Sequence, residues 1–373
     1  MGGSFSSGYK TERKRPSHQG LNSSSYVLLN SRTDDEFNCL KCFTLKEIKK
    51  TTKNFGRDSQ IDEHTLAPTK PGTGFAISVK WSDKLRYLGK IDWPTKINDL
   101  DQLRHPNLVK LIGYCLEVVH RPLLVYEFFT MGCLDNHLFR RASNFQPLSW
   151  KIRMKIALDA AKGLAFLHID EVNMIHGEFK TSKILIDSNY NAKLSVFGVT
   201  KAELEPNSGH YLFRRINMPL EFQSYIAPEY MLAGSLTKKC DVYSFGVVLL
   251  EIMSGKPAHY VYKAYKERLS EWAKSFLNDI NKISQVMDSD IEGQYSLLEA
   301  MKVARIVIQC VYGDHWNNVR IPMTHLSKGI CNFRSSQKSE ECNLNRQVVN
   351  EGVLLRIKVL IPTKTFLHKL FPT

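Results

Sequence analysis

The chain has 373 residues, of which 43% are hydrophobic and 24% carry a charge. This composition is ordinary for a folded protein and too apolar for a disordered one, and the length suits two or more units of ordinary domain size. The formal net charge of +14 favours anionic lipids, acidic proteins or nucleic acid as partners without choosing among them. No run of about 18 apolar residues is present, so the sequence excludes a membrane-spanning helix.

Residues 1–42 are rich in Ser, Gly, Asn and basic side chains and lack apolar periodicity, which predicts a flexible arm. The arm opens with Met-Gly-Gly-Ser-Phe-Ser, a pattern that makes Gly2 a candidate for myristoylation. Because one myristoyl chain binds a membrane only marginally, a second signal is required. Four basic residues can supply it by contact with an anionic leaflet: Lys10, Arg13, Lys14 and Arg15.

The eight cysteines are scattered through the chain and no cleavable signal peptide precedes them, which predicts reduced thiols in the cytosol. Cys39 and Cys42 are candidate palmitoylation sites that could add to the lipid anchor. Their spacing also suits zinc, but no second pair of ligands follows at a suitable distance. We therefore predict no metal site.

The stretch from 43 to 129 has the pattern of a small lobe rich in β-strands. A short amphipathic helix is predicted within 43–55, just before this lobe begins its sheet. The β-branched and aromatic segments 75–81 and 123–129 predict two strands, the second of them buried. Between them, residues 93–103 predict one helix that lies against the sheet.

Residues 130–326 predict a larger, mainly helical lobe. Apolar residues recur at near-helical spacing in 150–168, and the segment 241–253 is apolar around most of its circumference, which predicts a buried helix at the centre of the lobe. Amphipathic helices are predicted at 269–277 and 297–311. Strands followed by mostly helix give the α+β class.

The C-terminal tail, residues 327–373, diverges in character from the rest of the chain. It ends in a basic apolar stretch over 353–371, which could be an extra strand, a partner peptide or an artefact of the gene prediction. The sequence predicts that the last helix of the large lobe is truncated after Leu326, and we expect low local stability there.

Seven segments carry a recognisable pattern. In chain order they are AISVK at 76–80, HPNLVKLIGYC at 105–115, LLVYEF at 123–128, IHGEFKTSKILID at 175–187, AKLSVFG at 192–198, YIAPEY at 225–230 and DVYSFGVVLLE at 241–251. Together they resemble a protein kinase domain, specifically the plant receptor-like cytoplasmic kinases of the myristoylated subfamily VII type. The resemblance covers about residues 43–326 and implies a bilobal fold with a small β-rich lobe and a larger helical one.

The resemblance also implies a glycine-rich loop that closes over the ATP phosphates. Phosphoryl transfer depends mainly on such positioning of charge. Where that loop should follow Ile61, the chain reads DEHTLAPTKPG over 62–72. Side chains there, two of them acidic, would occupy the space in which phosphates need bare backbone amides.

Lys80 matches the strand lysine that contacts ATP in the family. Its helical partner, a glutamate in the family, aligns with Lys96. Two ammonium groups about 4 Å apart repel by roughly 4 kcal/mol at an effective dielectric constant of 20. We therefore expect no ion pair here, and Lys80 is either an ATP contact or an ordinary solvated lysine.

The catalytic loop departs from the family pattern at several positions. Glu178 stands at the position of the catalytic base, on a longer arm than aspartate, and Gly177 replaces an arginine. Lys183 and Val196 replace the asparagine and aspartate that bind magnesium, and neither side chain offers a lone pair to a hard cation. Lys180 matches a catalytic-loop lysine and could contact a nucleotide or an acidic partner.

Residues that resemble the structural ties of the family are retained. Asp241 is expected to hold the backbone of the catalytic loop, and His176 is expected to be a packed loop histidine. Glu229 and Arg320 are expected to pair across the large lobe. On the peptide side, however, Phe222 stands where the family has a threonine.

These departures predict an inactive serine/threonine kinase-like protein, a pseudokinase. The resemblance implies an adaptor, decoy or allosteric partner of receptor kinases, related cytoplasmic kinases or immune receptors at the cytoplasmic face of the plasma membrane. No cofactor is required, and ATP would bind weakly and without magnesium. Nucleic acid is not an expected partner, because no recognition module is present. The alternative is a weakly active atypical kinase that transfers phosphate from ATP to protein with Glu178 as base.

Overall fold

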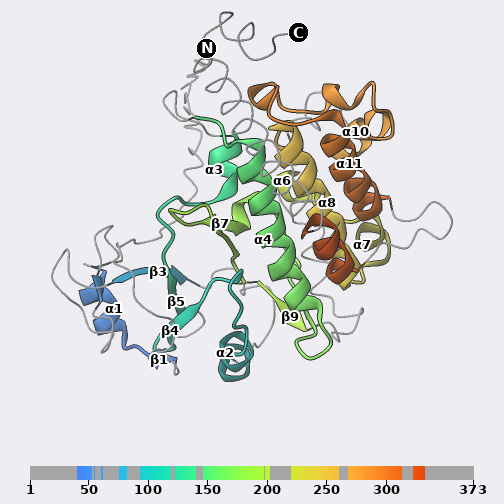
Figure 1. Cartoon of the computed structure of the whole chain (residues 1–373). Coiled ribbons are helices and arrows are strands. Elements are labelled where there is room, and N and C mark those ends of the chain that lie inside the picture. Colours follow the sequence, from blue (N-terminus) through green and yellow to red (C-terminus); the bar gives the residue numbers. More distant parts are fainter. Residues whose placement is uncertain are drawn as a thin grey trace, which may run out of the picture.

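The computed structural model describes residues 40–52, 54, 60–61, 75–81, 93–118, 122–139, 146–196, 198–201, 220–259, 268–312 and 322–331. Over these ranges a small lobe built on a sheet lies beside a larger lobe built mainly of helices (Figure 1). The predicted α+β, bilobal kinase-like fold is confirmed. None of the described helices has the length and apolar character needed to cross a membrane.

The small lobe contains a five-stranded sheet in the order β1-β4-β5-β3-β2. Its strands are β1 (Lys41–Cys42), β2 (Gln60–Ile61), β3 (Phe75–Trp81), β4 (Leu111–Cys115) and β5 (Leu123–Glu127). β5 lies antiparallel to both β3 and β4, and its first four residues are buried. This agrees with the buried strand that the sequence predicts, although the strand ends at Glu127 rather than at residue 129.

The sheet begins earlier in the chain than the predicted lobe. β1 pairs in parallel with β4, so Lys41 and Cys42, which were assigned to the flexible arm, belong to the edge of the sheet. The pairing requires glycine at 113, because a Cβ atom there would lie 2.3 Å from the carbonyl oxygen of Lys41 and 2.5 Å from the Phe43 ring. The chain therefore joins the small lobe before residue 43.

Helix α1 (Leu45–Thr51) follows β1 and packs on the same sheet. Thr44 and Glu47 form a capping box that satisfies the first free amides of the helix. The buried Ile48 side chain joins Phe43, Ile112 and other apolar residues in the core of the small lobe. The predicted short amphipathic helix is present within 43–55, but it follows the first strand of the sheet instead of preceding the sheet.

Helix α2 (Trp93–Asp101) buries Ile97 and Leu100 in the core that it shares with the large lobe. Its second residue is Pro94, which lacks an amide hydrogen and is tolerated in a first turn, where that amide would have no partner within the helix. The helix lies at the lower edge of the small lobe in Figure 1, near β4. This is the helix predicted over 93–103.

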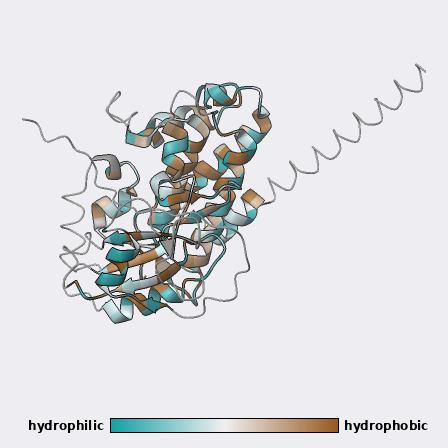
Figure 2. Ribbon diagram, turned by 90° about the vertical axis from the view of Figure 1, so that its left-hand side faces the viewer, coloured by the Kyte–Doolittle hydropathy of each residue, from teal (hydrophilic) through white to brown (hydrophobic). Residues whose placement is uncertain are grey.

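The large lobe is arranged around helix α8 (Lys238–Ser254). Every residue of α8 from 240 to 254 is buried, as the apolar circumference of the segment predicts. The other helices are α3 (Leu134–Phe139), α4 (Trp150–His168), α6 (Leu220–Gln223), α7 (Pro228–Ala233), α10 (Leu269–Leu277) and α11 (Leu297–Val311). In Figure 2 the strongly apolar ribbon lies in the helices at the middle of this lobe.

Two small antiparallel strand pairs flank the loops of the site. β6 (Met174–Ile175) pairs with β9 (Thr200–Lys201), and β7 (Ile184–Ile186) pairs with β8 (Ala192–Leu194). The segment between β6 and β7 contains a short 3-10 helix, η2 (Thr181–Lys183). Beyond α11, residues 323–331 are helical and bury Met323, Leu326 and Ile330, so the large lobe continues past its predicted end at residue 326.

Candidate functional site

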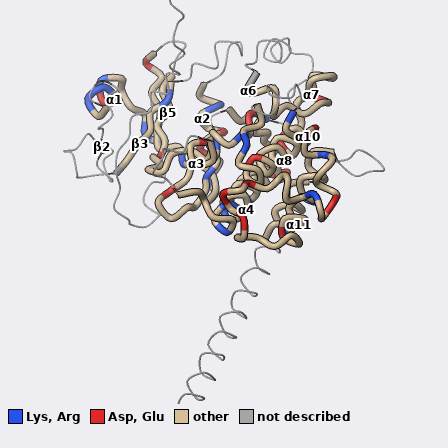
Figure 3. The backbone as a smooth tube through the Cα atoms, turned by 90° about the horizontal axis from the view of Figure 1, so that it is seen from above, with Lys and Arg blue, Asp and Glu red and all other residues tan. Residues whose placement is uncertain are grey.

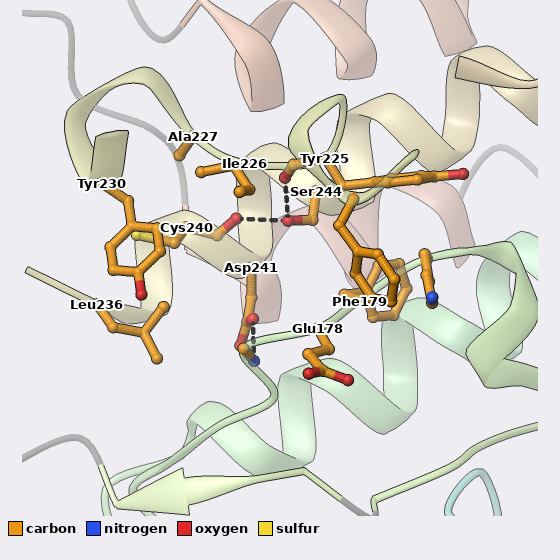
Figure 4. A pocket seen from close by; sticks show the side chains of 13 residues that line it. Glu178, Phe179, Tyr225, Ile226, Ala227, Tyr230, Leu236, Cys240, Asp241 and Ser244 are labelled. Atoms are coloured by element: carbon orange, nitrogen blue, oxygen red, sulfur yellow. Dashed lines mark hydrogen bonds between the residues drawn. The ribbon is translucent and has the colours of Figure 1, made fainter. Parts of the chain in front are cut away.

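A buried carboxylate from α8 fixes the loop that follows β6. The Asp241 side chain is 1% exposed, and its Oδ2 accepts hydrogen bonds from the amide of His176 at 2.7 Å and from Nε2 of His168 at 2.9 Å. Its Oδ1 accepts from the amide of Gly177 at 2.8 Å (Figure 4). These bonds confirm the role that the resemblance gives to Asp241, that of holding the backbone of the catalytic loop.

The carboxylate at the base position is neutralised within the chain. Glu178 Oε2 lies 3.7 Å from the Nζ atom of Lys183, and their side chains are only 7% and 13% exposed. Lys183 is the last residue of the short helix η2, and this turn of the chain brings its ammonium group back toward Glu178. An internal cation thus lies beside the carboxylate, at the position where the family pattern has a metal ligand.

Val196 belongs to the hydrophobic core. Its side chain is 1% exposed, and the preceding residue, Ser195, donates from its amide to the carbonyl of Lys183 at 2.9 Å. Valine methyl groups and a lysine ammonium cannot donate electron pairs to magnesium, so these residues do not fit the metal of the family. No group of three or more His, Cys, Asp or Glu side chains in the described part of the chain could hold a metal ion.

His176 is a structural histidine. Burial lowers the pKa of His176 to about 4, so the ring is neutral at physiological pH. Its Nε2 donates to the carbonyl of Ser195 at 3.1 Å, and its Nδ1 accepts from the amide of Glu178 at 3.4 Å. The ring therefore joins the loop after β6 to the segment after β8, as expected of a packed loop histidine.

The catalytic-loop lysine contacts an aromatic ring. Lys180 Nζ lies 3.4 Å from the centroid of the Phe222 ring, within the range of a cation–π interaction. Both residues line a small pocket of about 30 Å³ together with Glu178, Tyr225, Tyr230 and Leu236 (Figure 4). Since one water molecule needs roughly 10–15 Å³ by the same measure, this pocket has room for about two or three water molecules.

A buried acidic side chain, Glu251, ties the segment before α7 to α8. Glu251 Oε1 accepts from the hydroxyl of Tyr225 at 2.7 Å and from the amide of Ala258 at 2.8 Å. Its Oε2 is buried without a hydrogen-bond partner among the described residues. Burial raises the pKa of Glu251 to about 8, so the folded chain keeps this carboxyl protonated at neutral pH.

Glu251→Gln is expected to reduce the pH dependence of stability. Between the ordinary pKa of 4.5 and the folded value of about 8, the folded chain binds more protons than the unfolded chain, so this group lowers stability as pH rises. In this range the free energy of unfolding falls by up to about 1.4 kcal/mol per pH unit. Glutamine keeps Oε1 as the acceptor for Tyr225 and Ala258.

Thermal melts that follow circular dichroism check this prediction. The Tm of Glu251→Gln should exceed that of the wild type most at about pH 9, and the difference should shrink as pH falls and vanish near the ordinary pKa of 4.5. Exposed Glu292 provides the control, because Glu292→Gln should leave the pH profile unchanged. Equal pH profiles for Glu251→Gln and the wild type would contradict the buried, protonated carboxyl.

Lys96 lies against the backbone beyond Val196. We expected Lys96 to face Lys80 and to repel it; instead its Nζ donates to the carbonyl of Val199. Burial lowers the pKa of Lys96 to about 8, nearby Lys201 lowers it further, and Asp99 opposes the shift. Lys201 also forms a 3.0 Å ion pair with Asp99, so two contacts tie α2 to the residues at β9.

The remaining predicted residues are placed as follows. Lys80 lies in β3 opposite Leu124 of β5 and is half-buried, Glu229 lies in the first turn of α7, and the Cys42 thiol is free and exposed in β1. Several predictions fall outside the described residues: those for Gly2, Cys39, the loop at 62–72 and Arg320.

Sequence reasoning treated the substitutions one at a time and missed their pairing. In the structure Glu178 pairs with Lys183, and Lys180 contacts the ring of Phe222. From the sequence, each of these positions was compared with the family pattern by itself. The opposite charges of Glu178 and Lys183, five residues apart in one short loop, were the available signal. The bond between Tyr225 and Glu251 had no such signal, because their 26-residue separation says nothing about contact.

Comparison with known proteins agrees with the bilobal kinase-like fold. A family profile described as protein tyrosine and serine/threonine kinase matches residues 56–291. The chain is 44% identical over 342 residues to the probable serine/threonine-protein kinase PBL11 of Arabidopsis thaliana, covering 84% of this chain and 86% of that protein.

Two further relatives are similarly close. Receptor-like cytoplasmic kinase 176 of Oryza sativa subsp. japonica is 44% identical over 323 residues, with 83% of this chain and 79% of that protein covered. The serine/threonine-protein kinase BIK1 of Arabidopsis thaliana is 46% identical over 306 residues, with 78% and 76% covered. The chain therefore belongs to the protein tyrosine and serine/threonine kinase family and, within it, to the plant receptor-like cytoplasmic kinases.

Proposed function

We propose that this chain is a pseudokinase: it binds partner proteins at a membrane and does not transfer phosphate efficiently. The observation that carries the proposal is the ion pair between Glu178 and Lys183 beside the buried side chain of Val196. A general base must accept a proton from the incoming hydroxyl, and a carboxylate held by an ammonium group is a weaker base. The same ammonium group repels a divalent cation.

The frame of the fold supports a binding role that needs no nucleotide. Asp241 holds the catalytic loop through three hydrogen bonds, and Lys96 and Lys201 tie α2 to the residues at β9. Each of these contacts is made by groups of the chain itself. These intrachain contacts support a binding role for the fold that does not depend on ATP or magnesium.

Partner class and location follow from the family. The relatives include a protein named receptor-like cytoplasmic kinase, and we propose receptor kinases, related cytoplasmic kinases or immune receptors as partners. The myristoylation pattern at Gly2, with Cys39 and Cys42 as further acylation candidates, supports attachment to the cytoplasmic face of the plasma membrane.

A weakly active kinase is the second candidate. It is favoured by the names of the relatives, which are those of serine/threonine kinases, and by the carboxylate that Glu178 retains at the base position. In that case Lys80 would contact ATP, and the chain would transfer phosphate to serine or threonine of a protein.

The deciding experiment measures phosphate transfer and ligand-induced stabilisation on the purified full chain. We expect no magnesium-dependent autophosphorylation from radiolabelled ATP and no rise in Tm that requires magnesium. A rise in Tm with ATP alone would identify a nucleotide-stabilised scaffold, still without turnover. Autophosphorylation that Lys80→Ala abolishes would overturn the proposal in favour of the second candidate.

A further inference from the structure

Three lysines form one exposed face of helix α1. Lys46, Lys49 and Lys50 are spaced by three and four residues, so they lie on the same side of the helix, and all three are exposed. The opposite side of α1 buries Ile48 and Thr51 against the sheet. The lysine face is therefore held outward by the packing of the small lobe.

These three charges lack carboxylate partners within the described part of the chain. The nearby acids are engaged elsewhere, since Glu47 caps the helix start at Thr44 and Glu117 accepts from the amide of Leu45 at 2.7 Å. Like charges at this spacing destabilise a helix. An anionic surface placed against the lysine face would relieve that repulsion.

The lysine face adjoins the point where the chain enters the fold. α1 lies at the outer end of the small lobe, away from the helices of the large lobe (Figure 3). β1, immediately before it, is an edge strand that carries the exposed thiol of Cys42. The preceding 39 residues contain the basic cluster and the lipidation pattern at Gly2, so an attached membrane would approach the lobe from this end.

We infer that the lysine face of α1 docks the small lobe directly onto an anionic lipid surface. Contact through α1 would fix which end of the described fold faces the membrane. Three ammonium groups on a rigid helix present the positive charge that an anionic leaflet attracts. This inference rests on the proposed membrane attachment and adds the folded surface that would make the second contact.

Vesicle sedimentation tests the inference on the full chain. The wild type and a variant with Lys46→Gln, Lys49→Gln and Lys50→Gln are mixed with vesicles of phosphatidylserine and phosphatidylcholine, or of phosphatidylcholine alone. We expect the variant to lose affinity for the anionic vesicles on the order of 100-fold, because each lysine near the surface raises the affinity by about fivefold. Neither protein should gain affinity from the neutral lipid.

A matched variant separates this surface from net charge. Lys162→Gln, Lys239→Gln and Lys328→Gln remove the same charge from exposed positions of the large lobe and should leave vesicle binding near the wild-type value. Equal losses in both triple variants, or none in the α1 variant, would overturn the inference. Glutamine is a good helix former, and equal Tm values would show that all three proteins are folded.

The myristoylated chain distinguishes failure of this inference from failure of the proposed function. If the myristoylated wild type binds anionic vesicles and the α1 variant binds equally well, membrane attachment stands and docking through α1 is wrong. If the myristoylated wild type fails to bind either vesicle, the proposed membrane attachment itself is wrong, and the inference with it.

Discussion

Val196→Asp is expected to lower the free energy of unfolding by about 3 kcal/mol, because it introduces a carboxylate into a buried position of the apolar core. The side chain of Val196 is 1% exposed and belongs to the main hydrophobic core. The substitution that would restore the family's metal ligand is therefore expected to destabilise the folded chain. Equilibrium unfolding in urea measures the change.

Two comparisons sharpen this prediction. Val196→Ala creates only a small cavity and should cost about 1–2 kcal/mol, so a larger loss in Val196→Asp reports the buried charge. In the double variant Val196→Asp, Lys183→Asn, carboxylate and amide oxygens replace a methyl group and an ammonium. We expect magnesium to raise the Tm of the double variant and not that of the wild type. An equal magnesium response in both would contradict our account of the site.

Asp241→Ala is expected to lower the free energy of unfolding by about 4 kcal/mol, since it leaves three donors, two of them buried, without their acceptor. The donors are the amides of His176 and Gly177 and Nε2 of His168. Loss of this acceptor should also loosen the catalytic loop. Urea denaturation gives the stability, and hydrogen exchange at the two amides gives the local effect.

A second aspartate of the same lobe provides the control. Asp170 is fully exposed on its side chain and lies 3.7 Å from Lys238 in a surface ion pair. Such pairs contribute about 0–1 kcal/mol, so Asp170→Ala should change stability little. Similar losses for Asp170→Ala and Asp241→Ala would mean that the three hydrogen bonds do not stabilise the loop as we describe.

The large elements of the fold could be predicted from residue patterns because burial imposes a period on the sequence. Helix α8 is apolar all round because it is buried all round, and α10 and α11 have the predicted bounds. The start of α1 was also available, since Thr44 followed by Glu47 is the signature of a capping box. Using it would have set the helix start at residue 45.

The contacts of the site were less accessible to sequence reasoning. Alignment placed Lys96 opposite Lys80, but the long lysine side chain reaches the Val199 carbonyl, which belongs to a segment 103 residues away in the sequence. The same limit applies to Lys180 and Phe222, which meet only once the segment before α7 folds over the catalytic loop. Side-chain direction and loop path decide such contacts, and neither follows from residue spacing.

The entry of the chain into the sheet has a mechanical consequence. Because β1 pairs with β4 and the amide of Phe43 donates to the carbonyl of Tyr114 at 2.7 Å, tension applied to the chain before residue 40 reaches the sheet before it reaches α1. Gly113 lets the two strands approach closely enough to resist it. A side chain at 113 would push β1 away from β4, so the same tension would reach α1 without first being resisted by the sheet.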